Sequence, residues 1–521
     1  MALPYPTLPG DIDHLIADDH AVVERQFQHL EARRGDRRVL VDQVAFELAL
    51  HADAEERVLY PAMAEAGEAY EAEDSRKDHQ QVKELLVTLQ NTDPGEPEFE
   101  DALANLIGSV RRHVAEEEGE FLPAFRRAVG PQRLAELGKE FLAAKRAVPT
   151  YAHPNAPSGE TGHKLLDAGA KAVDMVRDKA TGRMKHLATD PSGALDPQAQ
   201  RILDAFAAME PQPFEILEPD QARRQPTPAD AVRKVLEDDG RPTDPEPVAS
   251  VQDMSIDGPG GRIGVRVYTP EGAGGGPLPI VLWIHGGGWV LFTVDTYDAS
   301  CRGIANRTGA IVVSPEYRRA PEHVFPAAHD DVLATYRWVR DNAEALGGDP
   351  ARIAIGGESV GGNMAAATCL QLAAMGEPLP TAQVLVYPLT TGEQFGDSMV
   401  DAADARPLNR PLLSWMAMHA FEGVPDAGSD PRVNLLSVPT DRLAGMPPTL
   451  VITDERDPLR DQGEEFARHL EQAGVPVTAS RYDGVMHEFF GAAAVLDKAA
   501  QAQTEAAEHL RRSFTAPAAA H

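Results

Sequence analysis

Residues 352–366 read Arg-Ile-Ala-Ile-Gly-Gly-Glu-Ser-Val-Gly-Gly-Asn-Met-Ala-Ala, and this stretch decides the fold of the larger part of the chain. Its first five residues have the length and apolar composition of a buried strand. A G-x-S-x-G sequence follows at 357–361, and an apolar segment of helical composition begins at Gly362. The glycines permit a sharp turn in which strand and helix approach closely. We therefore expect a strand–turn–helix unit with Ser359 at the turn as a nucleophile.

A second glycine-rich stretch, His285-Gly-Gly-Gly-Trp289, follows a predicted strand at 279–284, upstream of the serine. Consecutive glycines leave backbone N–H groups uncovered, so that they can donate hydrogen bonds to a substrate oxygen that becomes negatively charged. An ordinary glycine-rich turn is the alternative interpretation, which the downstream G-x-S-x-G disfavours. We expect this loop to form an oxyanion hole, assisted by the N-terminus of the helix that follows Ser359.

The chain also supplies an acid and a base after the serine. Asp454-Glu-Arg-Asp-Pro-Leu-Arg-Asp461 follows one predicted strand, and His487 follows the last predicted strand. Ser, then Asp, then His is the order expected for a G-x-S-x-G nucleophile. His487 is predicted to take the proton of Ser359 while a carboxylate holds its other ring nitrogen. Three aspartates compete for that role, and we favour Asp457, with the other two shaping the loop.

Strand-like and helical segments alternate from about residue 193 onward. The strand-like segments are short and look buried, as in a sheet that is covered on both faces. This alternation predicts a mostly parallel α/β sheet. The strands are expected at 262–268, 279–284, 310–314, 352–356, 382–387, 449–453 and 477–482.

The N-terminal part has a different pattern, in which amphipathic helices follow one another. They are expected at 11–34, 37–66, 69–91 and 97–129, with a shorter helix at 131–146. Four main helices with short connections predict an up-down-up-down bundle. The following segment contains a stretch rich in Pro, Gly and Ser and is expected to be a linker. The predicted domains are thus a bundle at 1–147, a linker at 148–192 and an α/β domain at 193–521.

Histidines and glutamates of the bundle are spaced for metal binding. Two helices repeat the pattern H-x-x-x-E, and each of the other two carries an Asp-His step. A spacing of four puts His and Glu on one helix face. Incidental histidines on a solvated face are the alternative, but ligands on all four helices favour a di-iron centre with bridging glutamates. The candidate ligands are His20, His51, Glu55, His79, His113 and Glu117.

Residues from about 193 to 510 resemble the hormone-sensitive-lipase-like branch of the α/β-hydrolases. The resemblance rests on HGGGW (285–289), YRRAPEHVFPAAHDD (317–331), GESVGGN (357–363), DPLRD (457–461) and GVMHEFF (484–490). It implies a cofactor-independent carboxylesterase for short- to medium-chain acyl esters and a cap formed by about 195–245 and 393–432. It also gives the acid role to Asp457 and the oxyanion donors to Gly287, Gly288 and Val360.

Residues 11–146 resemble the hemerythrin-like, HHE cation-binding family, which implies iron and the same six ligands. One departure is Lys83, which stands one turn after His79, where the oxygen-carrying relatives have another histidine. Lysine is not an ordinary iron ligand at neutral pH, so the site is one ligand short and simple oxygen carriage is disfavoured. Glu24, one turn after His20, could compensate for the missing ligand, although a solvated glutamate is favoured. His14 and His29 are interpreted as non-ligands.

Composition limits the partners of the protein. Its 81 acidic and 49 basic residues give a net charge of −32, which repels nucleic acid and anionic lipid. No apolar run approaches about 18 residues, so we expect no membrane insertion. Two cysteines and the lack of a visible signal peptide favour the cytoplasm. The expected partners are an ester substrate and iron, and a homo-oligomer is left open.

The sequence thus predicts a carboxylic ester hydrolase with a Ser-His-Asp triad, fused to an iron-binding bundle. The main alternative makes the bundle a sensor of iron, oxygen or redox state with the esterase as its regulated output. Two others remain open: an iron-storage or peroxide-handling module with a tethered hydrolase, and a metal-free assembly surface.

Overall fold

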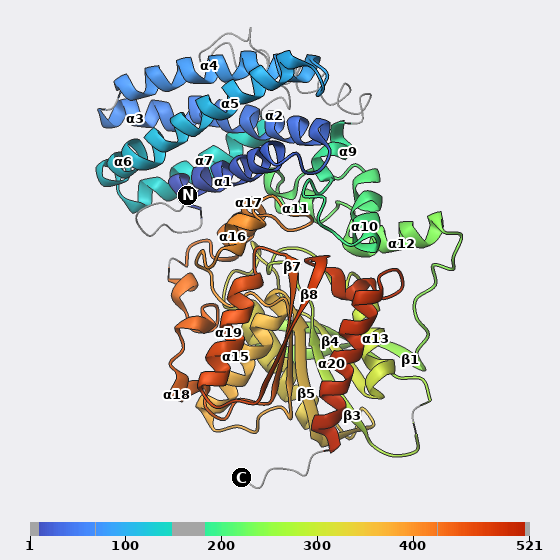
Figure 1. Ribbon diagram of the computed structural model, residues 1–521. Helices are drawn as coiled ribbons and strands as arrows, with labels where there is room; N and C mark the ends of the chain where they lie inside the picture. The colour runs from blue at the N-terminus through green and yellow to red at the C-terminus, as the bar shows by residue number, and fades with distance from the viewer. Residues whose placement is uncertain (1–9, 68, 148–182, 273, 425, 516–521) are drawn as a thin grey trace. The chain divides into compact units, whose positions relative to one another are not determined.

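The computed structural model describes residues 10–67, 69–147, 183–272, 274–424 and 426–515. The predicted linker falls largely on residues 148–182, which lie outside the described residues. Contacts divide the chain into two units (Figure 1). Unit 1 comprises residues 1–193, 207–218 and 400–415, and unit 2 comprises residues 194–206, 219–399 and 416–521.

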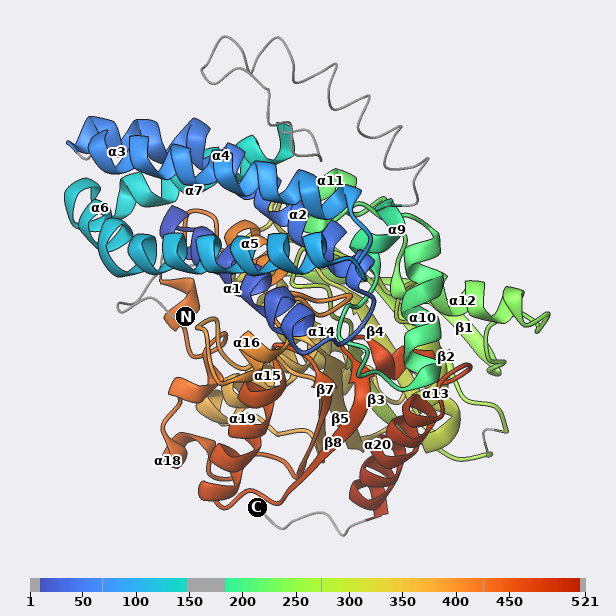
Figure 2. The same cartoon turned by 45° about the horizontal axis from the view of Figure 1, so that its top comes forward.

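Unit 1 contains the predicted helical bundle. Its helices α1, α2, α4 and α5 run side by side (Figure 2) around a core that includes Phe27, Leu86 and Phe99. The turn before α2 ends at Asp36, whose carboxylate accepts hydrogen bonds from two N–H groups of the first turn. The helices of the bundle are α1 Ile12–Glu31, α2 Arg37–Ala54, α3 Tyr60–Ala66, α4 Ala69–Asn91, α5 Pro97–Glu116, α6 Leu122–Val129 and α7 Pro131–Ala147.

Two of the long predicted helices contain a π-helical turn, η1 (Glu55–Leu59) and η2 (Glu117–Phe121). In each, the residue after the turn donates its N–H to the carbonyl of the glutamate five residues earlier. Pro61 and Pro123 follow directly. Proline has no N–H, and its ring clashes with the carbonyl four residues before it, so a wider turn relieves the helix. Such turns inside α-helices are frequent at functional sites.

Unit 2 is built on one sheet, in which the described residues form eight strands in the order β1-β2-β4-β3-β5-β6-β7-β8. β1 and β2 are antiparallel to their neighbours, and the six strands from β4 to β8 are parallel. The strands are β1 Ser250–Gly258, β2 Gly261–Thr269, β3 Leu278–Ile284, β4 Ile311–Glu316, β5 Gly348–Glu358, β6 Gln383–Val386, β7 Thr449–Arg456 and β8 Val477–Met486.

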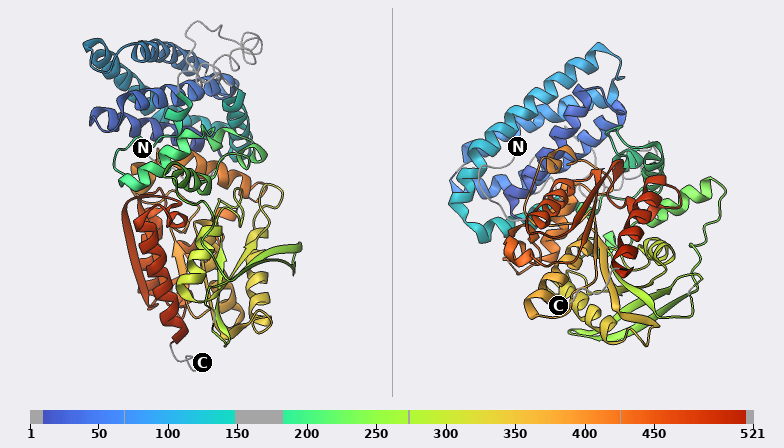
Figure 3. Two further views of the ribbon diagram at one scale, coloured as in Figure 1. Left: turned by 90° about the vertical axis from the view of Figure 1, so that its right-hand side faces the viewer. Right: turned by 60° about the horizontal axis from the view of Figure 1, so that its bottom comes forward.

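The predicted α/β class is confirmed, and all seven predicted strands are present. β1 was not predicted, because residues 251–255 are exposed on both faces and show no apolar alternation. The β1–β2 hairpin projects from the rest of the sheet (Figure 3). An exposed hairpin of this kind lacks the hydrophobic pattern from which strands are recognised.

Helices cover both faces of the sheet, α15 and α19 on one side and α13 and α20 on the other (Figure 1). β3 is buried between these layers from Ile280 to Ile284, and its Trp283 stacks on Phe490 at 5.6 Å between ring centroids. The covering helices are α13 Asp298–Thr308, α14 Ala327–Asp341, α15 Val360–Met375, α19 Arg460–Gln472 and α20 Asp497–Thr515.

The two segments predicted to form a cap are mainly helices and turns. The first contains α10 Pro197–Ala208, η3 Phe214–Ile216, α11 Pro219–Ala222 and α12 Pro228–Asp238, and the second contains α16 Ser398–Asp401, α17 Arg410–Ala420 and η4 Ala427–Ser429. The remaining short elements are α9 Arg183–Ala188, η5 Leu435–Ser437, α18 Thr440–Leu443 and η6 Phe489–Ala492. No helix among the described residues has both the length and the apolar character needed to cross a bilayer.

Candidate active site and metal centre

Each of the six parallel strands in the described sheet is followed at once by a polar or aromatic residue. The carboxyl ends of parallel strands meet at one edge of the sheet, which is where open α/β sheets bind ligands. The three predicted catalytic residues therefore reach the same edge from distant parts of the chain. The residues are Tyr317 after β4, His285 after β3, Ser359 after β5, Tyr387 after β6, Asp457 after β7 and His487 after β8.

Ser359 occupies the strained turn that the sequence predicted, at the N-cap of α15 with φ 58° and ψ −122°. L-residues rarely adopt this conformation, and it persists only where the surroundings impose it. A Cβ on Gly357 would lie 2.5 Å from the carbonyl carbon of Gly361, and a Cβ on Gly361 would lie 2.1 Å from the carbonyl oxygen of Ile284. Strand and helix can therefore approach this closely only at glycines.

Asp457 and His487 form a buried pair, with Nδ1 of the imidazole 2.8 Å from Oδ2 of the carboxylate. The other carboxylate oxygen accepts the backbone N–H of Leu459 at 2.8 Å, so the carboxylate is held from both sides. Burial alone would lower the pKa of His487, but the charge and hydrogen bond of Asp457 outweigh burial and raise it. Asp457 thus orients the ring and stabilises its protonated form.

Asp461 has a different role, as the sequence suggested. Its side chain accepts the backbone N–H of Ser398 at 2.8 Å and pairs with Arg460 at 2.8 Å. These contacts connect the loop after β7 to the start of α16, and they leave Asp457 as the carboxylate that holds His487.

The predicted oxyanion loop is anchored by His285. Its ring stacks on Tyr317 with centroids 4.2 Å apart, and Nδ1 donates to the carbonyl of Gly286 at 2.8 Å. Burial lowers the pKa of His285 to about 3, so the ring is neutral at ordinary pH. The loop passes beside the nucleophile, because a Cβ on Gly286 would lie 3.1 Å from the Cβ of Ser359.

The predicted oxyanion donors are two glycines and the first residue of α15. Gly287 and Gly288 have φ values of 101° and 60°, which favour glycine. A Cβ on Gly288 would lie 2.0 Å from Sδ of Met416. Val360 begins α15, where backbone N–H groups have no partner within the helix. The three residues thus combine uncovered backbone with a helix N-terminus.

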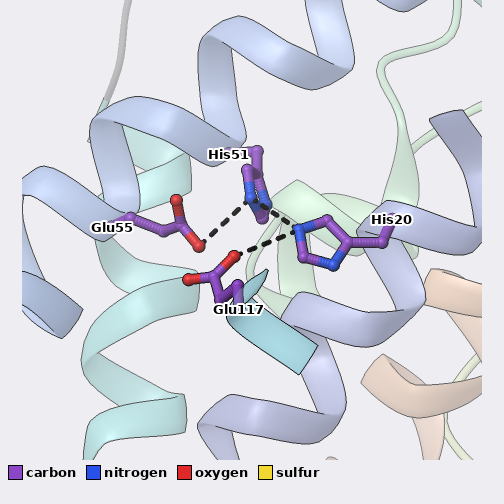
Figure 4. A group of neighbouring side chains, drawn as sticks. All are labelled: His20, His51, Glu55 and Glu117. Carbon is purple, nitrogen blue, oxygen red and sulfur yellow. Dashed lines mark hydrogen bonds and ion pairs between the residues drawn. The ribbon is translucent and has the colours of Figure 1, made fainter. Parts of the chain in front are cut away.

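The predicted metal ligands meet inside the bundle as two groups. His20, His51, Glu55 and Glu117 form the group drawn in Figure 4. Glu55, His79 and His113 form the other group. All six side chains are buried. Closest approaches include His20 Nε2 to His51 Nε2 at 3.2 Å, His51 Nε2 to Glu55 Oε1 at 3.1 Å and His79 Nε2 to Glu55 Oε2 at 3.3 Å.

Both glutamates lie between the two groups of histidines. Glu55 reaches one group with each of its oxygens, and Oε2 of Glu117 lies 3.5 Å from His20 Nε2 and 3.7 Å from His113 Nε2. Each glutamate is the first residue of a π turn. This arrangement matches the predicted bridging position of the glutamates between two cations.

Every predicted histidine ligand also faces a carboxylate from another helical segment through Nδ1. For His20 and His51 the carboxylate lies within hydrogen-bonding distance, which fixes the tautomer and leaves Nε2 free to bind a metal. Sequence analysis missed this ring, although its signal is present: Asp-His and Glu-Glu pairs that each combine an inner ligand with an outer partner. The pairs are His20 with Glu118 at 3.0 Å, His51 with Asp19 at 3.1 Å, His79 with Glu56 at 3.5 Å and His113 with Asp78 at 3.8 Å.

The residues present fit a bound cation. Glu117 Oε2 and His113 Nε2 are buried without a hydrogen-bond partner among the described residues. Leaving a buried polar group unsatisfied costs about 1–3 kcal/mol, which a shared cation would offset. Burial and the charge of Glu55 raise the pKa of Glu117, while burial lowers the pKa of His113 to about 3. Carboxylate oxygens and imidazole nitrogens are suitable donors for iron.

Lys83 and Tyr60 lie near the second group, where the sequence lacks the further histidine of the oxygen-carrying relatives. Lys83 Nζ pairs at 3.0 Å with Glu56, the carboxylate that faces His79, and so supports that histidine from outside the centre. Tyr60, which sequence analysis did not single out, is buried with its hydroxyl 3.2 Å from Oε2 of Glu55 and 3.1 Å from Nε2 of His79. The phenol thus brings an additional oxygen to the side of the centre with fewer donors.

Glu24, the alternative ligand, and the two predicted non-ligands have other contacts. Glu24 pairs with Arg111 at 2.9 Å, His14 Nε2 lies 3.2 Å from the hydroxyl of Ser414, and His29 Nε2 lies 3.5 Å from Asp404. None of the three belongs to either group of candidate ligands among the described residues.

Comparisons with known proteins match both parts of the chain. Residues 281–491 match a family model described as alpha/beta hydrolase fold, and residues 11–125 match one described as hemerythrin HHE cation binding domain. Esterase LipI of Mycobacterium tuberculosis is 37% identical over 62% of this chain and 96% of LipI. An ethyl acetate hydrolase of Pseudomonas putida is 35% identical over 58% and 92%. A solved Pyrobaculum calidifontis esterase has a TM-score of 0.55 and 36% identity over 62% and 100%.

The close approach of β3 and α15 gives a first prediction. Gly361→Ala places a Cβ against the backbone of Ile284, so strand and helix must separate, and we expect a loss of about 1–3 kcal/mol in the free energy of unfolding. Urea unfolding followed by circular dichroism measures it. Gly428→Ala is the matched control, because a Cβ there meets nothing within 4 Å. An unchanged midpoint for Gly361→Ala would contradict the packing described.

Proposed function

Because the chain belongs to the α/β-hydrolase family of esterases and carries an N-terminal hemerythrin HHE cation-binding domain, we propose that it hydrolyses short- to medium-chain acyl esters at Ser359. Carboxylic ester hydrolysis itself is supported by the esterase relatives. The observation that carries the proposal of a triad is the buried Asp457–His487 pair at the same sheet edge as the strained serine.

The proposed reaction uses groups of this chain alone. Ser359 attacks the ester carbonyl and transfers its proton to His487, whose positive charge Asp457 stabilises. Backbone N–H groups of Gly287, Gly288 and Val360 donate to the oxyanion. His487 then protonates the leaving alcohol, and water, activated by the same imidazole, releases the acid and restores the serine.

The packing around the nucleophile favours short acyl chains. Val360 is 1% exposed, and Met416 lies against the oxyanion loop at Gly288. Both side chains take up space next to the position of the substrate carbonyl, which favours small acyl groups. The name of the Pseudomonas putida relative, ethyl acetate hydrolase, agrees with this preference.

Removal of the nucleophile gives the second prediction. We expect Ser359→Ala to lower kcat for p-nitrophenyl acetate by roughly 10⁴-fold or more, because the acyl-enzyme can no longer form. A fluorophosphonate probe should label the wild-type protein once and the variant not at all. Ser437→Ala, outside the site, serves as the control and should keep both activities. Stoichiometric labelling or full turnover in Ser359→Ala would exclude this serine as the nucleophile.

We propose further that the bundle binds two iron ions. His20 and His51 would hold one ion and His79 and His113 the other, with Glu55 and Glu117 between them. Tyr60 would contribute an oxygen to the second ion, on the side where Lys83 replaces the further histidine of oxygen-carrying relatives. Bound iron would supply redox chemistry, and the outer carboxylates would hold the imidazoles in place.

Iron content gives the third prediction. We expect close to two iron ions per wild-type chain by elemental analysis. Glu117→Gln should lose at least one, because the amide replaces a carboxylate oxygen that lies near both His20 and His113. Glu24→Gln, whose side chain pairs with Arg111, should bind iron like the wild type. Equal iron in Glu117→Gln and wild type would argue against the centre.

The same preparations test the role of Tyr60. A phenolate bound to ferric iron gives a visible charge-transfer band, which should be present in the oxidised wild-type protein and absent in Tyr60→Phe at similar iron content. An unchanged visible spectrum in Tyr60→Phe would show that the phenol is not a ligand.

A second candidate function, regulation of the esterase by the bundle, is favoured by buried contacts of α1. Within unit 1, Asp18 accepts a hydrogen bond from Arg410 Nε at 2.5 Å and another from the hydroxyl of Ser414. Asp18 immediately precedes Asp19 and His20 of the metal centre. The same helix, α17, supplies Met416, which within unit 2 lies against Gly288. A change at the metal centre could thus alter substrate binding.

This alternative gives the fourth prediction. If α1 and α17 are coupled, iron loading should change kcat/KM for p-nitrophenyl esters severalfold in the wild type, and Asp18→Asn should reduce that change. Breaking one side of a buried ion pair costs about 3–5 kcal/mol, so thermal unfolding should be measured in parallel. Glu31→Gln at the exposed end of α1 is the control. Equal rates with and without iron would exclude regulation by the metal.

A further inference from the structure

Asp454 is a second buried carboxyl group at the proposed triad. It lies in β7, three residues before Asp457, and is 0% exposed. One oxygen of Asp454, one of Asp457 and a ring nitrogen of His487 all lie within 4.8 Å of one another. Neither oxygen of Asp454 accepts a hydrogen bond from any described residue. Two carboxyl groups therefore lie close together, and the oxygens of Asp454 have no donor among the described residues.

The surrounding charges do not supply a partner for an ionised Asp454. The charged groups acting on it are Asp457, Arg460 and Glu488, in addition to the nearby His487. The charge of Arg460 lowers the pKa of Asp454, but the guanidinium is engaged by Asp461 at 2.8 Å and by the carbonyl of Glu455 at 3.2 Å. Two adjacent carboxyl groups in a buried site cannot both ionise without a large cost.

The two carboxyl groups differ in what stabilises their negative charge. Asp457 accepts hydrogen bonds from His487 Nδ1 and from the N–H of Leu459, so its ionised form is stabilised. Asp454 has no such donor, and burial together with the charge of Asp457 raises its pKa well above the usual value. Of the two carboxyl groups, Asp454 is therefore the one that keeps a proton.

We propose that Asp454 is a positioning residue that remains protonated and donates a hydrogen bond from its carboxyl group to Asp457. This inference rests on the proposed function, because it concerns the carboxylate that orients His487. A neutral donor at this position fixes Asp457 from a third direction. It also adds no second negative charge beside His487. Such a charge would raise the pKa of His487, so less of the imidazole would be free to accept the serine proton at neutral pH.

Two variants of similar size separate donation from charge. Asp454→Asn keeps a neutral donor, so kcat per active serine should stay within about threefold of wild type. The fall of kcat/KM on the acid side of its pH profile (the acid limb) should move by less than about 0.3 pH units. Asp454→Leu removes the donor, and we expect kcat to fall about tenfold or more at unchanged KM. Active sites are counted with the fluorophosphonate probe. Glu455→Gln, an exposed neighbour, is the control for loss of a carboxylate.

The opposite results overturn the inference. An ionised Asp454 would raise the pKa of His487, so Asp454→Asn would then move the acid limb down by about one pH or more. Wild-type kcat in Asp454→Leu would show that no donor is needed. If Asp454→Leu does not fold, the asparagine variant and infrared spectroscopy decide.

The infrared measurement is independent of turnover. The wild-type protein at neutral pH should show the C=O band of a protonated carboxyl group that Asp454→Asn lacks, and the absence of this difference contradicts a protonated Asp454. Failure of the proposed function would appear differently, as ester turnover without labelling of Ser359.

Discussion

The active site depends on the register of parallel strands. Glu358 at the end of β5 pairs with Val386 at the end of β6, and Arg456 at the end of β7 pairs with Met486 at the end of β8. The next residue on each strand is therefore brought beside its neighbour, which is how Asp457 and His487 come within hydrogen-bonding distance. A shift of one residue in either pairing would turn one of these side chains to the other face of the sheet. The proposed catalytic geometry thus depends on the pairing of the parallel strands and not on the loops alone.

The metal centre is organised by a different constraint, the need to keep buried polar atoms partnered. Six ligands and four outer carboxylates lie within or beside an apolar bundle, where an unpaired charge would be expensive. Each outer carboxylate comes from a different helical segment than its histidine, so the ring joins the four helices to one another. Lys145 extends this network, because its ammonium group holds Asp19 at 2.6 Å. Ligand placement and helix packing therefore support each other in this bundle.

Sequence reasoning identified the helices, the parallel strands and the residues that meet at both sites, because each leaves a local pattern. Helical periodicity located the bundle, and glycines that admit no Cβ marked the nucleophile turn. Other features left no such pattern. β1 is exposed on both faces, and each π turn spans five residues, which is too short a stretch to show a periodicity of its own. The association of residues 400–415 with unit 1 depends on long-range pairs such as Asp18 with Arg410. Such a pair cannot be predicted from the sequence pattern of either segment alone.

The π turns also set the angular phase of the residues that follow them. In a regular α-helix, two residues five positions apart point about 140° away from each other, so Tyr60 would face away from Glu55. The wider turn of η1 brings the phenol back to the same side as the glutamate. The direction of the Tyr60 side chain therefore depends on the π turn and not only on the identities of these residues. If the same residues formed a regular α-helix, the aromatic ring would turn out of the centre, while the preceding His51 and Glu55 would stay in step.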